Sequence, residues 1–230
     1  METVAKRLER IREKIAEAAL RSGRNPESVQ IVGVTKTVPV ERIAEAVRAG
    51  IRIFGENYVQ ESLQKMEALA SPEISWHFIG RLQSNKARHA VLRFELIHSV
   101  HSEKLAREID RQAARLNRVQ PVLLQVNTGE ETSKTGVMPN DAMDLVKRVS
   151  RLQNVSIRGL MTMPPFFDAP DRVRPFFRAL HDLKKRITDA GLENISMEHL
   201  SMGMTGDFEV AVEEGATLVR IGTALFGKRQ

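Results

Sequence analysis

Apolar residues near the N-terminus of the chain recur every three or four positions, with charged side chains between them. This spacing places them on one face of an amphipathic helix. The face consists of Val4, Leu8, Ile11, Ile15 and Ala18. Gly23 and the Asn25-Pro26 pair interrupt the pattern. We therefore predict an N-terminal helix within residues 1–22.

From residue 29 onward, short apolar runs typical of buried strands alternate with helical patterns. Eight runs are predicted as strands: residues 29–34, 51–54, 76–79, 96–99, 122–126, 155–160, 195–200 and 217–221. Each is followed by a helix or a short helical turn. The clearest helices are one that begins after a Ser102 cap and one that ends at Gly191.

Regular alternation of strand and helix indicates parallel strands joined by crossover helices. Eight such units favour an α/β fold, a (β/α)8 TIM barrel with an extra N-terminal helix. We expect one domain over residues 1–230, with the barrel in residues 29–227. A doubly wound open sheet is the alternative, and it ordinarily carries a Gly-rich dinucleotide turn after its first strand. Here that turn reads Val34-Thr35-Lys36-Thr37-Val38-Pro39.

Composition narrows the function classes. The chain has 230 residues and no cysteine, which excludes disulfides, thiol chemistry and cysteine-ligated metals. No apolar run approaches the roughly 20 residues that cross a bilayer, and the charged N-terminus does not resemble a secretory signal. We expect a cytoplasmic protein that binds no membrane.

The net charge of +6 is compatible with a phosphate-bearing partner. However, Lys and Arg are interspersed with Asp and Glu, and aromatic residues make up only 5% of the chain. These features are typical of a solvated basic surface rather than a base-stacking platform. We predict no nucleic-acid binding, while a small anionic ligand remains compatible with the pattern.

Two loops at the ends of predicted strands combine glycines with hydroxyl groups. Residues 201–206 include Ser201, Gly203 and Thr205, and Gly222-Thr223 follows the last strand. In this fold, loops after strands seven and eight are the recurrent phosphate site, where backbone N–H groups and helix N-termini attract anions. Glycines in one such loop are explained by tight turns, but two neighbouring loops favour a phosphate.

Lys36 leaves an apolar strand at the predicted barrel mouth. It is either a surface lysine, a partner for an anion, or an amine that forms a Schiff base with a carbonyl. The last role needs a neutral amine, which desolvation and neighbouring cations favour. Together with a phosphate site and the lack of cysteine, Lys36 suggests pyridoxal 5′-phosphate (PLP) as the cofactor.

Arg220 lies in the apolar run Leu218-Val219-Arg220-Ile221. An arginine side chain is rarely buried without a partner. Arg220 pairs either with an internal carboxylate or with the pyridine nitrogen of PLP. A fixed donor at that nitrogen keeps it unprotonated and weakens it as an electron sink. His77 is either a core histidine or stacks on the ring, and Asn57 either donates near the phenolic oxygen or caps a helix. The other histidines show no metal-binding spacing.

Long motifs of the chain resemble the pyridoxal phosphate homeostasis protein family, which shares the alanine racemase N-terminal barrel. The resemblance covers nearly the whole length. The motifs are Val34-Thr35-Lys36-Thr37, Phe54-Gly55-Glu56-Asn57-Tyr58-Val59-Gln60-Glu61, Trp76-His77-Phe78-Ile79-Gly80, Leu82-Gln83-Ser84-Asn85-Lys86, Arg158-Gly159-Leu160-Met161, Leu200-Ser201-Met202-Gly203-Met204 and Val219-Arg220-Ile221-Gly222-Thr223.

This resemblance implies roles for individual residues. Lys36 would carry the Schiff base, Arg220 would face the pyridine nitrogen, and Asn57 and Met161 would lie near the ring. The phosphate would be held by Ser201, Gly203, Met204, Thr205, Gly222 and Thr223. Thr205 stands where serine is usual, and Gly206 replaces a common acidic residue.

The resemblance also implies reversible PLP binding that contributes to vitamin B6 and amino-acid homeostasis, without efficient turnover. The expected protein is a monomer, with apo PLP-dependent enzymes as recipients. The alternative is a PLP-dependent amino-acid racemase of low activity. Full-length racemases take a second acid/base tyrosine from an added C-terminal domain of the partner subunit. We expect no such domain here, and the only tyrosine is Tyr58. A third alternative is a module that binds nucleic acid or protein, and only the net positive charge favours it.

Overall fold

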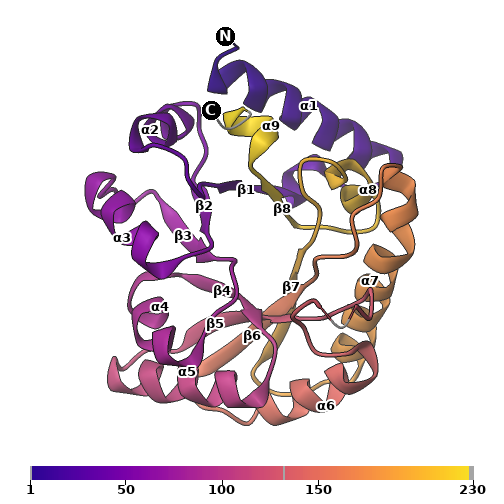
Figure 1. Ribbon diagram of the computed structural model, residues 1–230. Coiled ribbons are helices and arrows are strands. Elements are labelled where there is room, and N and C mark those ends of the chain that lie inside the picture. The colour runs from indigo at the N-terminus through magenta and orange to yellow at the C-terminus, as the bar shows by residue number, and fades with distance from the viewer. Residues whose placement is uncertain (1, 132, 228–230) are drawn as a thin grey trace.

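The computed structural model describes residues 2–131 and 133–227. Its eight strands form a closed barrel in sequence order, and every neighbouring pair is parallel (Figure 1). The strands are β1 (Gln30–Val34), β2 (Ile53–Glu56), β3 (Ser75–Phe78), β4 (Leu96–Val100), β5 (Gln120–Gln125), β6 (Val155–Met161), β7 (Ile195–Ser201) and β8 (Leu218–Ile221). Because β1 pairs with β8, the barrel prediction is confirmed and the open sheet is excluded.

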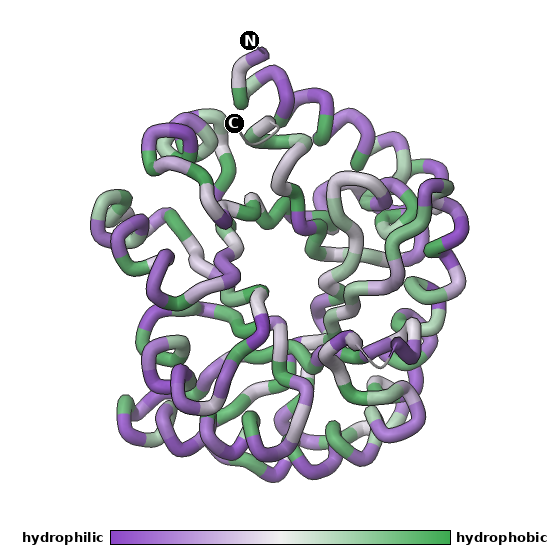
Figure 2. The backbone as a smooth tube through the Cα atoms, in the orientation of Figure 1, coloured by the Kyte–Doolittle hydropathy of each residue, from purple (hydrophilic) through white to green (hydrophobic). Residues whose placement is uncertain are grey.

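Helices surround this barrel (Figure 1). They are α1 (Val4–Arg21), α2 (Val40–Arg48), α3 (Val59–Ala68), α4 (Ala87–Arg93), α5 (Glu103–Arg115), α6 (Pro139–Val149), α7 (Arg174–Asp189), α8 (Phe208–Glu213) and α9 (Thr223–Phe226). Three 3₁₀ turns add to them: η1 (Pro26–Ser28), η2 (Ser84–Lys86) and η3 (Pro170–Val173). In Figure 2 the outer turns of the helices are mainly hydrophilic, as expected for amphipathic helices that cover a barrel.

The predicted N-terminal helix is confirmed as α1. All five residues of its predicted apolar face are buried. The Thr3 side chain caps the helix by accepting a hydrogen bond from the backbone N–H of Lys6. The helix packs against α8, α9 and α2, so it covers the side of the barrel where β8 meets β1. Among the described residues, no helix has the length and apolar character needed to cross a membrane.

A small apolar cluster comes from five different strands and contains Val32, Leu96, Leu123, Met161 and Leu218. It is separate from the large core between strands and helices. Side chains from alternating strand positions fill the interior of a parallel barrel in this way, so the interior is packed and the reactive groups are left to the strand ends. The loops that follow the strands therefore lie together at one end of the barrel.

Candidate functional site

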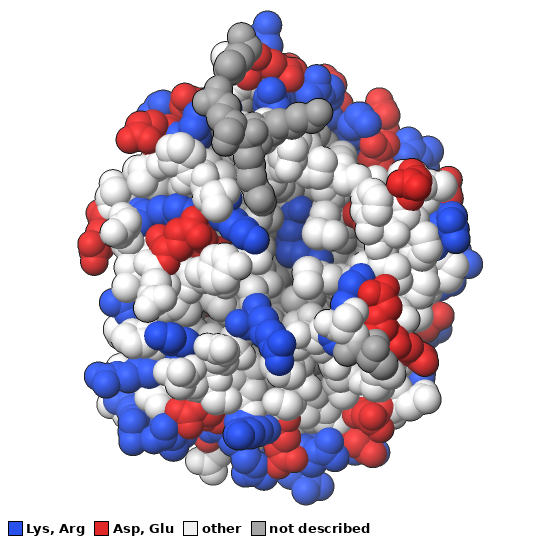
Figure 3. Space-filling model, in the orientation of Figure 1, with Lys and Arg blue, Asp and Glu red and all other residues white. Residues whose placement is uncertain are grey.

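A cavity of about 1110 Å³ lies at the carboxyl ends of the strands. Its wall brings together seven of the residues predicted from the sequence: Lys36, Asn57, Met204, Thr205, Arg220, Gly222 and Thr223. Figure 3 shows basic side chains where this face of the molecule is hollowed at its centre. The predicted residues therefore come from four separate loops and strands and meet in one place.

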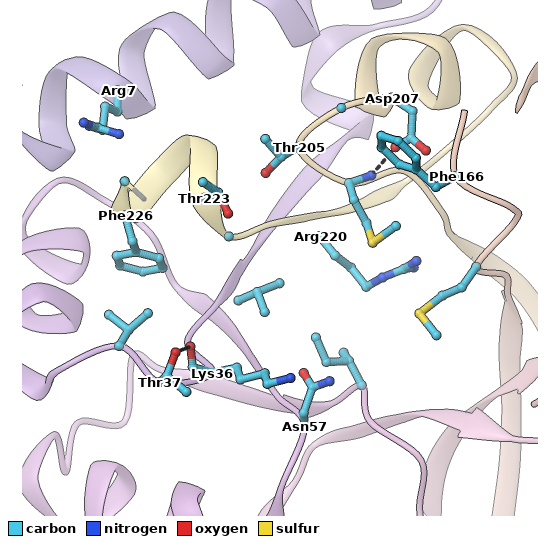
Figure 4. A pocket seen from close by; sticks show the side chains of 18 of the residues that line it. Arg7, Lys36, Thr37, Asn57, Phe166, Thr205, Asp207, Arg220, Thr223 and Phe226 are labelled. Carbon is cyan, nitrogen blue, oxygen red and sulfur yellow. Dashed lines mark hydrogen bonds between the residues drawn. The ribbon is translucent and has the colours of Figure 1, made fainter. Parts of the chain in front are cut away.

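Lys36 extends from the turn after β1 into this cavity, with Asn57 beside its end (Figure 4). The lysine is half-buried, and its Nζ lies 5.5 Å from the centroid of the Tyr58 ring. The next residue, Thr37, has a φ of 60°, in the left-handed region, which gives the turn its sharp bend. The Thr37 N–H donates to Glu61 Oε1 at 2.6 Å. The turn is thus tied to helix α3.

A buried ionic network lies next to this turn. The Lys65 ammonium, on α3, donates to the Thr35 carbonyl at 2.6 Å, to Glu56 Oε1 at 2.7 Å and to Glu61 Oε1 at 2.6 Å. The Thr35 hydroxyl also donates to Glu56 Oε1, at 2.6 Å. The network joins the ends of β1 and β2 to α3, and Lys36 directly follows the bonded Thr35.

Burial raises the pKa of Glu56, although the hydrogen bonds from Lys65 and Thr35 oppose the shift. Burial acts in the same direction on Glu61, but there the Lys65 and Thr37 hydrogen bonds prevail and lower the pKa. This network was not predicted from the sequence. Its signal was that Lys65 follows the buried Val59 and Ser62 at steps of three, which places it on the inner face of α3.

Arg220 is the buried cation of the cavity, with only 3% of its surface exposed. One terminal nitrogen donates to Ser201 Oγ at 2.7 Å and the other to the Thr162 carbonyl at 2.9 Å. Within the described part of the chain no carboxylate forms an ion pair with it, so the internal-carboxylate alternative is not observed. Burial lowers the pKa of Arg220 to about 10, and the Asp207 charge counteracts part of this shift. A buried cation without an ion-pair partner calls for an acceptor from a ligand.

The two predicted phosphate loops offer free donors. In the described residues, the backbone N–H groups of Thr205, Gly206 and Thr223 have no hydrogen-bond partner. A Cβ placed at Gly206 meets nothing within 4 Å, so the space there is open. The helices that follow have only six and four residues, so loop amides and hydroxyls contribute more to anion binding than helix dipoles do.

Two acidic residues, Glu2 and Asp207, also lie on this wall. Asp207 accepts a hydrogen bond from the Met204 N–H at 2.6 Å. Burial raises the pKa of its carboxyl group. The Met204 amide is therefore already used within the loop, and an anion bound here relies on the neighbouring amides.

Four predicted residues do not lie on the cavity wall. Met161 belongs to the barrel-interior cluster, and Ser201 and His77 take part in buried hydrogen bonds. Gly203 has a φ of 87°, and a Cβ there would lie 2.5 Å from the Ala211 Cβ, so this glycine lets the loop pack on α8. Direct contact of these four residues with a cofactor stays a prediction.

Sequence analysis also missed part of the wall. The loop after β6 contributes Met163, Phe166 and Phe167, and the Phe166 side chain is 85% exposed. Arg7 and Arg42 extend the wall towards α1 and α2. The exposed aromatic residue at the mouth was signalled by the run Met163-Pro164-Pro165-Phe166-Phe167, which has no helix or strand period.

Two buried histidines lie beside Arg220. His98 Nδ1 is 2.9 Å from Ser201 Oγ, and His98 Nε2 is 3.0 Å from His77 Nδ1. Burial lowers the pKa of His77 to about 3 and places that of His98 well below its usual range, and the Arg220 charge adds to the shift of the His98 pKa. Both imidazoles are therefore neutral at neutral pH.

These lowered pKa values predict acid sensitivity. Between pH 6.5 and pH 3 the unfolded chain binds protons that folded His77 does not, so the free energy of unfolding falls as the pH falls through this window. The slope is at most about 1.4 kcal/mol per pH unit for each such histidine. Urea unfolding from pH 7 to pH 4 should show a smaller slope for His77→Gln than for the wild type. The exposed His89→Gln serves as control, and equal slopes for all three proteins would contradict this account.

Comparison with known proteins identifies the family. Residues 7–230 match the family described as alanine racemase, N-terminal domain. The pyridoxal phosphate homeostasis protein of Aquifex aeolicus is 47% identical over 224 residues, which cover 97% of each chain. The chain belongs to this family of homeostasis proteins. The resemblance stated from the sequence motifs is thereby confirmed.

Other relatives agree with this membership. The pyridoxal phosphate homeostasis protein of Escherichia coli K12 is 40% identical over 237 residues, covering 100% of this chain and 98% of the other. PipY of Synechococcus elongatus, solved with PLP bound, superposes with a TM-score of 0.83 at 39% identity, covering 98% of this chain and all of PipY. An alanine racemase of Clostridium difficile shares only 16% identity, with a TM-score of 0.70, and 56% of that chain is covered. That similarity concerns the fold alone.

Proposed function

We propose that this protein holds PLP reversibly through a Schiff base at Lys36 and contributes to intracellular vitamin B6 and amino-acid homeostasis without efficient turnover. One observation carries the proposal: Lys36 and the buried, ion-pair-free Arg220 line the same cavity as the free loop amides. An aldehyde, a basic ring nitrogen and a phosphate are what such a set of groups binds. PipY, a relative of this family, was solved with PLP bound.

Different residues of the cavity wall bind different parts of PLP. Lys36 would hold the aldehyde end of PLP, where its amine would form a Schiff base with loss of one water, and hydrolysis would reverse the bond. Arg220 donates to the ring nitrogen, and Asn57 lies beside Lys36, within the same wall. The loop amides of Thr205, Gly206 and Thr223 receive the phosphate. Met204 and Gly222 complete that part of the wall.

The same groups favour a carrier over an enzyme. A pKa of about 10 keeps Arg220 charged at neutral pH, and a guanidinium ion can only donate hydrogen bonds, so it cannot accept one from a protonated ring nitrogen. The ring is then a weak electron sink. Racemisation also needs a second acid/base group on the face opposite Lys36. Tyr58 is the only tyrosine of the sequence; its ring centroid lies 5.5 Å from Lys36 Nζ, and it is not part of the described cavity wall.

The racemase alternative is tested by turnover. We expect the PLP-loaded protein, incubated with L-alanine or L-serine, to form no more than trace D-enantiomer, because the ring is a weak electron sink and no tyrosine lies on the described cavity wall to act as the second acid/base group. Chiral chromatography measures the product, with an authentic alanine racemase as positive control. Substantial conversion would replace the carrier proposal with the racemase alternative.

Delivery to other enzymes is the finer part of the proposal. We expect a cytoplasmic monomer, since described residues of one chain wall the cavity, and apo PLP-dependent enzymes as recipients. Adding a stoichiometric apo-enzyme to the loaded protein should remove the visible absorption of the bound PLP and restore the activity of the acceptor. An unchanged spectrum with an inactive acceptor would contradict delivery.

A further inference from the structure

Four side chains form a continuous buried chain of hydrogen bonds inside the barrel. It runs from Arg220 to Ser201 at 2.7 Å, from Ser201 to His98 at 2.9 Å, and from His98 to His77 at 3.0 Å. Ser201 and His98 have no exposed surface, and Arg220 and His77 are 3% and 6% exposed. This series of hydrogen bonds connects β8, β7, β4 and β3. Only its Arg220 end lies on the cavity wall.

The donors in this chain follow one direction. Arginine can only donate, so Ser201 Oγ accepts from Arg220. The Ser201 hydroxyl proton has one acceptor among the described residues, His98 Nδ1. His98 must then carry its own proton on Nε2 and donate to His77 Nδ1. The reverse tautomer of His98 would leave the buried Ser201 proton without an acceptor, which is costly.

The hydrogen-bond acceptors of Arg220 are uncharged. The two terminal nitrogens of Arg220 donate to Ser201 Oγ and the Thr162 carbonyl, so the plane of the guanidinium is fixed at two points. Neither acceptor carries a charge, and neither histidine becomes protonated near neutral pH. A carboxylate in the same place would cancel the arginine charge. Neutral acceptors leave that charge to act on the cavity, where the Asp207 carboxyl on the wall is the acidic group that acts on it.

We propose that Ser201 and His98, supported by His77, are positioning residues that aim a fully charged Arg220 at the pyridine nitrogen of bound PLP and keep that nitrogen unprotonated. This rests on the proposed function, because it concerns the same PLP site. It assigns Ser201 and His77 a role through Arg220 in place of direct contact with the cofactor. His98, to which sequence analysis gave no function, becomes the central link.

Nitrogen NMR of the bound cofactor tests this directly. The protein is loaded with PLP labelled with ¹⁵N in the ring, and the chemical shift is followed between about pH 5 and pH 9. The wild type should show an unprotonated ring nitrogen at neutral pH, with any protonation confined to the acid end of this range. In Ser201→Ala and His98→Leu we expect the proton affinity of the ring nitrogen to rise about tenfold, one pKa unit, as one charge-assisted donor loses its alignment.

Two further variants separate positioning from structure. His98→Asn places an amide oxygen near the position of Nδ1 and should restore the wild-type chemical shift. His101→Leu changes a half-buried histidine that, among the described residues, is bonded to the Ser99 carbonyl and does not belong to the hydrogen-bonded series, so it should leave the chemical shift unchanged. Circular dichroism checks folding. Ser201→Ala removes one oxygen atom, so it decides the outcome even where His98→Leu does not fold.

The outcomes distinguish this inference from the proposed function. Labelled PLP that fails to bind the wild type overturns the proposed function. PLP that binds Ser201→Ala with the wild-type chemical shift and titration overturns the positioning role and leaves the function standing. A protonated ring nitrogen in the wild type at neutral pH also overturns the inference. A raised proton affinity in Ser201→Ala, with rescue by His98→Asn, supports it.

Discussion

Replacing Lys36 with alanine is expected to abolish the covalent attachment of PLP while the barrel remains folded. The half-buried side chain forms no hydrogen bond or ion pair among the described residues, so its removal should change the free energy of unfolding by about 1 kcal/mol or less. Without its amine, the aldehyde of PLP has no partner in the cavity wall. Absorption spectra before and after borohydride reduction measure the effect, which should fall from about one reducible adduct per chain to background.

A matched control is Lys147→Ala. This lysine lies on α6, is largely exposed, and is not part of the cavity wall. It should keep the full reducible adduct. Stoichiometric covalent PLP in Lys36→Ala, at whatever other lysine, would mean that the assignment of Lys36 is wrong.

Lys65→Met is expected to lower the free energy of unfolding by about 3–5 kcal/mol, the usual effect of leaving a buried charge without its partner. The variant leaves the Glu56 carboxylate, which has no exposed surface, without its counter-ion. It also frees the Thr35 carbonyl next to Lys36. Urea unfolding measures the loss.

The size of this loss should depend on pH. Burial already raises the pKa of Glu56, and removing Lys65 takes away the hydrogen bond that opposes the shift. A carboxyl group whose pKa is raised in the folded state destabilises that state once the pH exceeds the pKa of the same group in the unfolded chain. The deficit of Lys65→Met should therefore grow from pH 5 to pH 8.

Two controls accompany the measurement. The double variant Lys65→Met/Glu56→Leu removes both charges and should recover much of the loss. Arg111→Ala breaks an exposed ion pair with Glu108 and should cause no measurable change. A Lys65→Met variant as stable as the wild type at pH 8 would contradict the view that this network holds the turn of Lys36.

The barrel was predictable because its signals are local. A helical period of three to four residues and short apolar strand runs are read directly from the sequence, and parallel connectivity places all strand ends at one mouth. This is why the sequence alone assigns Lys36, Thr205 and Thr223 to one site. Strand ends differ by one or two residues: β3 spans Ser75–Phe78, whereas residues 76–79 were predicted.

The polar interior was not predictable in the same way. Ser201 ends β7 and pairs with Met161 on one side and Leu218 on the other, so its hydroxyl faces the barrel interior. The sequence predicts Ser201 as the first residue of a phosphate-binding loop. A shift of one residue reverses the direction of a strand side chain, and sequence boundaries carry errors of that size.

Lys65 shows a second limit. Its three acceptors come from the end of β1, the end of β2 and the first turn of α3. Such a long-range combination leaves no repeat or motif in the sequence. A charged residue on a helix is ordinarily solvated, so the spacing after Val59 and Ser62 marks the inner face of α3 without showing which acceptors Lys65 reaches.

The central claim is that one particular amine holds the vitamin. The wild-type protein is mixed with PLP, reduced with borohydride, digested and analysed by mass spectrometry. The account predicts a single modified peptide, the one that contains Lys36, with about one pyridoxyl phosphate per chain. Modification centred on a different lysine, or spread evenly over the surface lysines, would contradict it.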